Sequence, residues 1–276
     1  MMMRGLDPFK FGEAVRRLVT RDGPSGRERL YKKAPSNDPR NRDRDFRVSN
    51  YYLKTAVADA LGCNLRCVFC WAIDHFRDYS NIKNVGTFYS PAKVANALIA
   101  TAKSLNCKYL RMTEGEPTLD MNHLIVVLDN LKKMNVPYTF ILETNGMILG
   151  KYPNFAKRLS EYGINLMGEP FAHVRVSIKG PTAEKFRLLT FADVSFYKLQ
   201  FAALSNCLDA GVSVHPATML DFIESKEEME TLRVSLLDVD ESMVKKLEFE
   251  RLFLEDYIVA RLKNYGIPFE KVLEVG

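Results

Sequence analysis

The stretch KYLRMTEGEPTLDMNHLIVVLDNLKKMNVPYTFILET, residues 108–144, contains the alternation that decides the fold. Residues 108–113 and 138–144 are short, mostly apolar runs, which is typical of strands. Between them, from about residue 120, apolar side chains recur with helical spacing. A strand, a helix and a second strand in this order predict a βαβ unit with parallel strands and a right-handed crossover.

The same alternation extends in both directions along the chain. Further strands are expected at residues 53–61, 172–179, 212–220 and 247–254. Ser90 and Pro91 favour a helix start, and further helices are expected at residues 154–163, 196–211, 225–237 and 256–266. These βα units, six in all, predict an α/β fold, a partial (β/α)6 TIM-type barrel with parallel strands. In such barrels the functional groups follow the C-terminal ends of the strands.

Charge divides the chain into two parts. Residues 1–50 hold 13 Lys and Arg against 7 Asp and Glu, whereas the remaining residues hold 26 against 27. We therefore predict a basic, partly extended N-terminal arm over residues 1–50, with a short helix near residues 12–20, and one barrel domain over residues 51–276. The arm either packs on the barrel as a solvated segment or holds an anionic partner such as RNA.

Composition indicates the compartment. No run of about 18 apolar residues occurs, so no membrane span is expected, and the N-terminus lacks the apolar core of a secretory signal. The chain has five cysteines, an odd number, and two of them stand alone, Cys107 and Cys207. A disulfide framework is therefore not expected, and a reducing, cytoplasmic location is predicted.

The other three cysteines, Cys63, Cys67 and Cys70, form a C-x3-C-x2-C cluster after the first predicted strand. A structural zinc ion needs four ligands, and here only His75 is near enough in sequence to be the fourth. A 4Fe–4S cubane is the other possibility, because three of its irons can take thiolates while the fourth stays open to a small molecule.

This spacing, with the aromatic Phe69 just before the third cysteine, resembles the signature of the radical S-adenosylmethionine (SAM) superfamily. The resemblance implies that Cys63, Cys67 and Cys70 hold a 4Fe–4S cluster whose open iron binds SAM. It also implies an oxidoreductase-like enzyme that cleaves SAM reductively to a 5′-deoxyadenosyl radical. An electron donor of the ferredoxin or flavodoxin type is the implied partner.

Motifs after the next strands extend the resemblance over about residues 54–220. Gly115 and Glu116, before Pro117, are similar to the Gly-Gly-Glu-Pro motif that binds the SAM amino group, with Glu114 in place of the first glycine. After the third strand, Glu143, Thr144, Asn145 and Gly146 are similar to a motif of pyruvate formate-lyase activating enzymes and 7-carboxy-7-deazaguanine synthases. After the fourth, Ser177 and Lys179 are similar to the Ser-x-Lys version of the deazaguanine synthases, where activating enzymes tend to have Asp-x-Lys. The resemblance implies that these side chains bind SAM.

His215, on the fifth predicted strand, is a candidate for a role toward substrate or SAM, or for a hydrogen-bonded core histidine. The substrate itself stays open. The resemblance allows a glycyl-radical protein, an RNA as in the wybutosine pathway, or a small molecule such as a purine-like cofactor precursor. A non-catalytic zinc-binding module is the alternative from a different class.

Overall fold

A computed structural model describes residues 5–32, 45–50, 52, 54–72, 79, 82–252 and 254–269. Its centre is a run of six parallel strands in the order β4-β6-β7-β8-β9-β10. Their bounds are β4 (Thr55–Ala60), β6 (Tyr109–Glu114), β7 (Thr139–Thr144), β8 (Ala172–Ile178), β9 (Ser213–Met219) and β10 (Glu248–Glu250). The predicted α/β fold with six parallel strands is confirmed.

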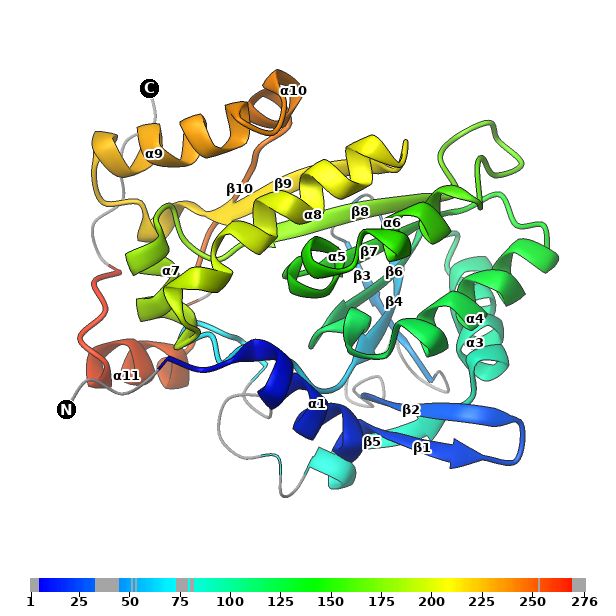
Figure 1. The fold of residues 1–276 in the computed structure, drawn as a ribbon. Helices are drawn as coiled ribbons and strands as arrows, with labels where there is room; N and C mark the ends of the chain where they lie inside the picture. Colours follow the sequence, from blue (N-terminus) through cyan, green and yellow to red (C-terminus); the bar gives the residue numbers. More distant parts are fainter. Residues whose placement is uncertain are drawn as a thin grey trace.

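Helices follow the strands along the chain, and most of them pack on one face of the sheet, whereas those after β8 and β10 that contact the cysteine loop lie at its end (Figure 1). They are α3 (Pro91–Ser104), α4 (Met121–Lys133), α5 (Met147–Lys151), α6 (Pro153–Ser160), α7 (Ala183–Thr190), α8 (Lys198–Asp209), α9 (Lys226–Leu237), α10 (Glu241–Lys245) and α11 (Asp256–Asn264). The Ser90 side chain accepts from Lys93 N and so caps α3 as predicted. The largest apolar cluster lies between this helical layer and the sheet, with Leu98, Leu128 and Val174 fully buried.

The N-terminal segment differs from the expected arm where the structure describes it. Helix α1 (Pro8–Val19) leads into an antiparallel hairpin of β1 (Thr20–Gly23) and β2 (Gly26–Lys32). Strand β2 pairs with β4 and with β5 (Gly86–Tyr89), and β3 (Arg47–Ser49) also pairs with β4. Over residues 20–32 the segment is a paired hairpin, and Leu30 and Tyr31 are fully buried where this hairpin joins the sheet.

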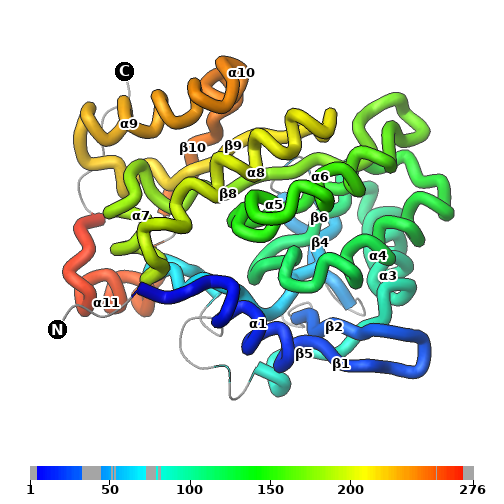
Figure 2. The backbone as a smooth tube through the Cα atoms, viewed as in Figure 1, coloured from blue at the N-terminus to red at the C-terminus, as the bar shows by residue number. Residues whose placement is uncertain are grey.

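Helix α1 crosses from the region of α7 to the hairpin (Figure 2). Leu6, just before α1, forms a parallel bridge with Ala192, just after α7. The helix begins at Asp7, whose carboxylate accepts from Phe9 N and Lys10 N. The N-terminal segment is thus anchored to the barrel at both of its ends. None of the described helices is long and apolar enough to cross a membrane.

Candidate active site

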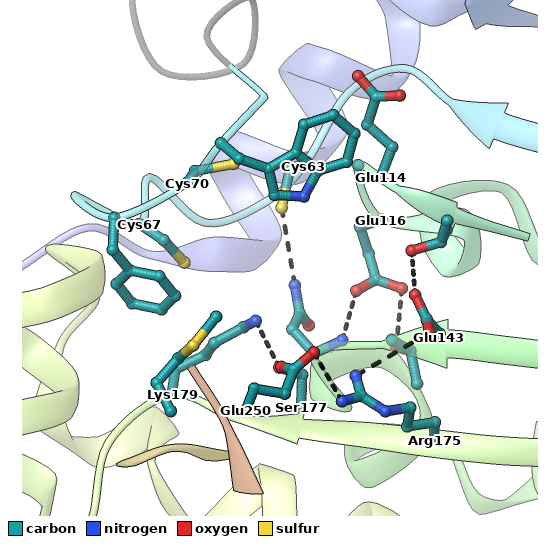
Figure 3. A pocket seen from close by; sticks show the side chains of 17 residues that line it. Cys63, Cys67, Cys70, Glu114, Glu116, Glu143, Arg175, Ser177, Lys179 and Glu250 are labelled. Atoms are coloured by element: carbon teal, nitrogen blue, oxygen red, sulfur yellow. Dashed lines mark hydrogen bonds and ion pairs between the residues drawn. The ribbon is translucent and has the colours of Figure 1, made fainter. Parts of the chain in front are cut away.

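A cavity of about 170 Å³ lies where β4, β6, β7, β8 and β9 end (Figure 3). It brings together side chains that are far apart in sequence but share the C-terminal edge of the sheet. Its lining residues are Cys63, Cys67, Phe69, Cys70, Trp71, Thr113, Glu114, Gly115, Glu116, Glu143, Thr144, Asn145, Arg175, Ser177, Lys179, Met219 and Glu250. The residues predicted to hold the cluster or SAM are here, except Gly146, which follows directly as the N-cap of α5, and the candidate His215.

The cysteine loop follows β4 and is tied to the end of α7. Arg66 N donates to Thr190 O at 3.3 Å, and Val68 N donates to Leu189 O at 2.8 Å. The three cysteines are free thiols, and burial raises their pKa values, that of Cys67 to about 12. A raised pKa favours the neutral thiol, so a metal centre that binds these sulfurs must displace their protons.

The zinc alternative required His75, which lies outside the described residues. Within the part of the chain that the structure describes, no three His, Cys, Asp or Glu side chains are grouped so as to hold one metal ion.

Gly115 is required by close packing. A Cβ at this position would lie 2.5 Å from Ala60 O and 2.3 Å from Gly62 O. Gly115 N donates to the first of these carbonyls at 2.9 Å, and Glu116 N donates to the second at 2.7 Å. The backbone of this loop is therefore pressed against the start of the cysteine loop, which explains why glycine stands here.

The Glu116 carboxylate joins two loops rather than projecting freely. It is fully buried, and its Oε1 accepts from Thr118 N at 3.1 Å, from Thr118 Oγ1 at 2.6 Å and from Thr144 Oγ1 at 2.7 Å. Its Oε2 accepts from Asn145 N at 2.7 Å. Glu116 thus holds the loop after β6 against the loop after β7, a positioning role that sequence reasoning missed.

Glu114 occupies an unfavourable conformation and environment. Its φ of 81° lies in the left-handed region, which disfavours a side chain with a Cβ. Its side chain is fully buried, Lys32 Nζ lies 3.4 Å from Oε1, and Oε2 has no hydrogen-bond partner in the described structure. Burial, then the charge of Asp59, raises the pKa of Glu114 to about 8.

A network of ion pairs fills the wall formed by β6, β7, β8 and β10. Glu143 accepts from Thr113 Oγ1 and from Arg111 NH1, the latter at 3.1 Å. Arg175 is 3% exposed and binds Glu248 at 3.1 Å and Glu250 at 2.8 Å. Glu250 was missed from sequence, although Glu248 and Glu250 alternate along a predicted strand and so had to share a face.

Lys179 lies near the cysteines, and little in the described structure offsets the positive charge of its ammonium group. Its Nζ donates to Ser177 Oγ at 2.7 Å and lies 5.7 Å from the centroid of the Phe69 ring. Within the described part of the chain, the ammonium group has Ser177 as its hydrogen-bond partner and acts electrostatically on Cys67 and Cys70. Its ammonium group is therefore available to an anionic group of a ligand.

His215 does not line the cavity. Its Nδ1 lies 2.7 Å from Nε2 of His173, and its Nε2 lies 2.8 Å from Glu248 Oε2. His215 stands opposite Arg175 in the register of β8 and β9, so the two side chains share a face of the sheet. His215 is half-buried, and both of its ring nitrogens have partners within the protein.

Comparison with known proteins shows the family. The model of the Radical SAM superfamily matches residues 59–234, which is more than half of the chain. The chain belongs to the radical SAM superfamily, whose members are enzymes that use a 4Fe–4S cluster and SAM and typically need a reductant. No curated protein matches the sequence.

Among solved structures, the crystal structure of Streptococcus suis SuiB bound to S-adenosylmethionine is similar in fold. The TM-score is 0.50 at 14% sequence identity, and the match covers 74% of this chain and 44% of SuiB. The chain thus spans less than half of the length of that protein. The likeness shows a shared fold.

The donor set of the cavity fits the cofactors of the family. Three thiols from one loop stand on one side, and thiolates are the ligands that iron–sulfur clusters require. Cys63 Sγ accepts from Leu65 N at 3.4 Å, and such N–H donors stabilise a thiolate. Asn64 Nδ2, on the same loop, is buried and has no partner in the described structure.

Proposed function

We propose that this protein is a radical SAM enzyme in which Cys63, Cys67 and Cys70 hold the 4Fe–4S cluster and the cavity beside them holds SAM. When bound, these cofactors supply a one-electron cleavage that gives a 5′-deoxyadenosyl radical, which abstracts a hydrogen atom from the substrate. The observation that carries the proposal is that the C-x3-C-x2-C cysteines and the C-terminal ends of the parallel strands line one cavity.

The surrounding residues receive distinct roles in this proposal. Lys179, held by Ser177, would bind the SAM carboxylate, because its ammonium group lies beside the cysteines with a hydroxyl as its hydrogen-bond partner. The backbone at Gly115 would hold the SAM amino group, and Phe69 would pack against the cofactor. Glu116 and Glu143 keep the strand ends in place through the contacts described above. The buried walls exclude water from the radical.

The motifs at Glu143–Gly146 and Ser177–Lys179 support a place near pyruvate formate-lyase activating enzymes and 7-carboxy-7-deazaguanine synthases. A ferredoxin or flavodoxin is the proposed electron donor, and the cytoplasm the proposed location. A small molecule is the favoured substrate, with a glycyl-radical protein as the alternative.

Over the residues that the structure describes, the basic N-terminal segment gives no support to an RNA substrate. Arg16 and Arg17 pair with Glu13, Arg21 pairs with Glu28, and Arg27 pairs with Asp120. Arg29 is fully buried and donates to the carbonyl oxygens of Glu116 and Pro117. These charges serve the fold, and we propose that residues 1–50 brace the barrel domain, residues 51–276.

Anaerobic reconstitution with iron and sulfide, followed by SAM and dithionite, tests the proposed function. We expect about four irons per chain and 5′-deoxyadenosine on chromatography. Cys67→Ala should lose both, whereas Cys207→Ala, a buried cysteine of α8 away from the cavity, should keep both. Zinc without iron or sulfide, or no 5′-deoxyadenosine from the loaded protein, would refute the proposal.

A further inference from the structure

The first cysteine of the cluster loop differs from the other two in its surroundings. Cys63 Sγ accepts from Leu65 N at 3.4 Å and from the side-chain amide Nδ2 of Asn145 at 3.8 Å (Figure 3). Neither Cys67 nor Cys70 receives a side-chain N–H from the described part of the chain; the Cys70 thiol instead lies 3.8 Å from Ala72 O. One sulfur of the three therefore has an amide donor delivered from another strand end.

The orientation of the Asn145 amide follows from its neighbours. Met147 N, a backbone group that can only donate, lies 3.1 Å from one side-chain atom of Asn145, which must be the oxygen Oδ1. The other atom is therefore the nitrogen Nδ2. Its two hydrogens have two acceptors, Asn64 Oδ1 at 2.7 Å and Cys63 Sγ at 3.8 Å.

Burial makes this arrangement rigid. Asn145 is 4% exposed and Asn64 is fully buried. The Asn145 backbone is fixed as well, because its N–H donates to the Glu116 carboxylate at 2.7 Å. Gly12 of α1 closes the site from outside, since a Cβ there would lie 2.8 Å from the Cβ of Asn64. Every polar group of Asn145 that could turn toward a ligand is thus engaged within the protein, apart from its carbonyl.

We propose that Asn145 is a positioning residue that donates an N–H to Cys63 Sγ and thereby raises the reduction potential of the cluster. This rests on the proposed function, which makes Cys63 a cluster ligand. A hydrogen bond to a cluster sulfur withdraws electron density and favours the reduced state, which carries the extra negative charge. In a water-poor site the effect of such a donor is not screened.

The test is the midpoint potential of the reconstituted full-length chain, followed by electron paramagnetic resonance during a redox titration without SAM. Asn145→Ala removes the donor, and Asn145→Asp replaces it with an acceptor while keeping Oδ1 for Met147 N. We expect reduction to become about threefold to tenfold less favourable in Asn145→Ala, which is about 30 to 60 mV for one electron, and less favourable still in Asn145→Asp.

Asn165→Asp is the matched control. Its Oδ1 accepts from Met167 N at 2.8 Å and its Nδ2 donates to Thr139 Oγ1 at 3.3 Å, so the same chemistry occurs at the start of β7, at the opposite end of the strand from Asn145. This variant should keep the wild-type potential. Asn64→Ala gives a second test with residue 145 intact, because it removes the acceptor that orients the Asn145 amide, and it should also lower the potential.

The outcomes separate the inference from the proposed function. A wild-type chain that binds no iron and sulfide contradicts the proposed function. If the cluster-loaded Asn145 variants and Asn64→Ala have the same midpoint potential as the cluster-loaded wild type, the inference is overturned. An unchanged potential with a weaker SAM affinity in Asn145→Ala, measured by equilibrium dialysis, also overturns it, because Asn145 would then contact SAM instead of Cys63.

Discussion

Replacement of Glu114 by glutamine should stabilise the fold, and more so as the pH rises. Burial, then the charge of Asp59, raises the pKa of this carboxyl from 4.5 to about 8. Between these two values the folded state binds a proton that the unfolded state has lost, so wild-type stability falls with increasing pH. The stabilisation from protonated Glu114 is complete below pH 4.5 and lost as the pH passes through about 8.

The size of the stability difference follows from the pKa shift of Glu114. At about 1.4 kcal/mol per pKa unit, a shift from 4.5 to about 8 costs the wild type about 1 kcal/mol at pH 5 and about 4 kcal/mol at pH 8. Glutamine keeps the shape of the side chain and does not titrate in this range. The advantage of Glu114→Gln should therefore grow by about 3 kcal/mol between these two pH values.

Urea denaturation of the metal-free protein at pH 5, 6.5 and 8 measures this difference. Glu114→Gly is the companion variant, because it removes the same carboxyl and also relieves the left-handed φ of 81°, which is worth about 1 kcal/mol. Both variants should share one pH dependence relative to the wild type. A difference in unfolding free energy that stays constant from pH 5 to pH 8 would refute the reasoning.

Three further predictions concern residues around the cavity. Gly115→Ala should lower stability by about 1–3 kcal/mol in denaturant titrations, because its Cβ would meet the Ala60 and Gly62 carbonyls at 2.5 and 2.3 Å; an unchanged midpoint contradicts this. Glu116→Gln should cost about 1–3 kcal/mol in the same assay, because an amide NH₂ would face a donor on one side; equal stability means that the carboxylate does not join the loops. Lys179→Met should weaken SAM binding by about tenfold or more in equilibrium dialysis while iron content stays normal, and an unchanged affinity removes Lys179 from the SAM site.

The sequence alone was sufficient to predict the features that depend on residues close together in the chain. Alternation of short apolar runs with amphipathic segments determined six parallel strands, because neither element type tolerates the spacing of the other. The C-x3-C-x2-C spacing needs only one loop, so Cys63, Cys67 and Cys70 could be identified together. Glycine at residue 115 was likewise visible as part of a motif.

Only the tertiary structure shows which polar side chains are hydrogen-bonded within the protein and which can bind a ligand. Glu116 and Asn145 were expected to face SAM, yet their hydrogen-bond partners lie at the ends of other strands. Asn145 N donates to Glu116 Oε2, 29 residues away in sequence, and Asn145 Nδ2 donates to Cys63 Sγ, 82 residues away. His215 belongs to Glu248 and His173, and Arg29 lies beneath the loop after β6. A sequence pattern states which side chains can bond, but only the fold states which atoms are within hydrogen-bonding distance, and at a buried site that distance decides function.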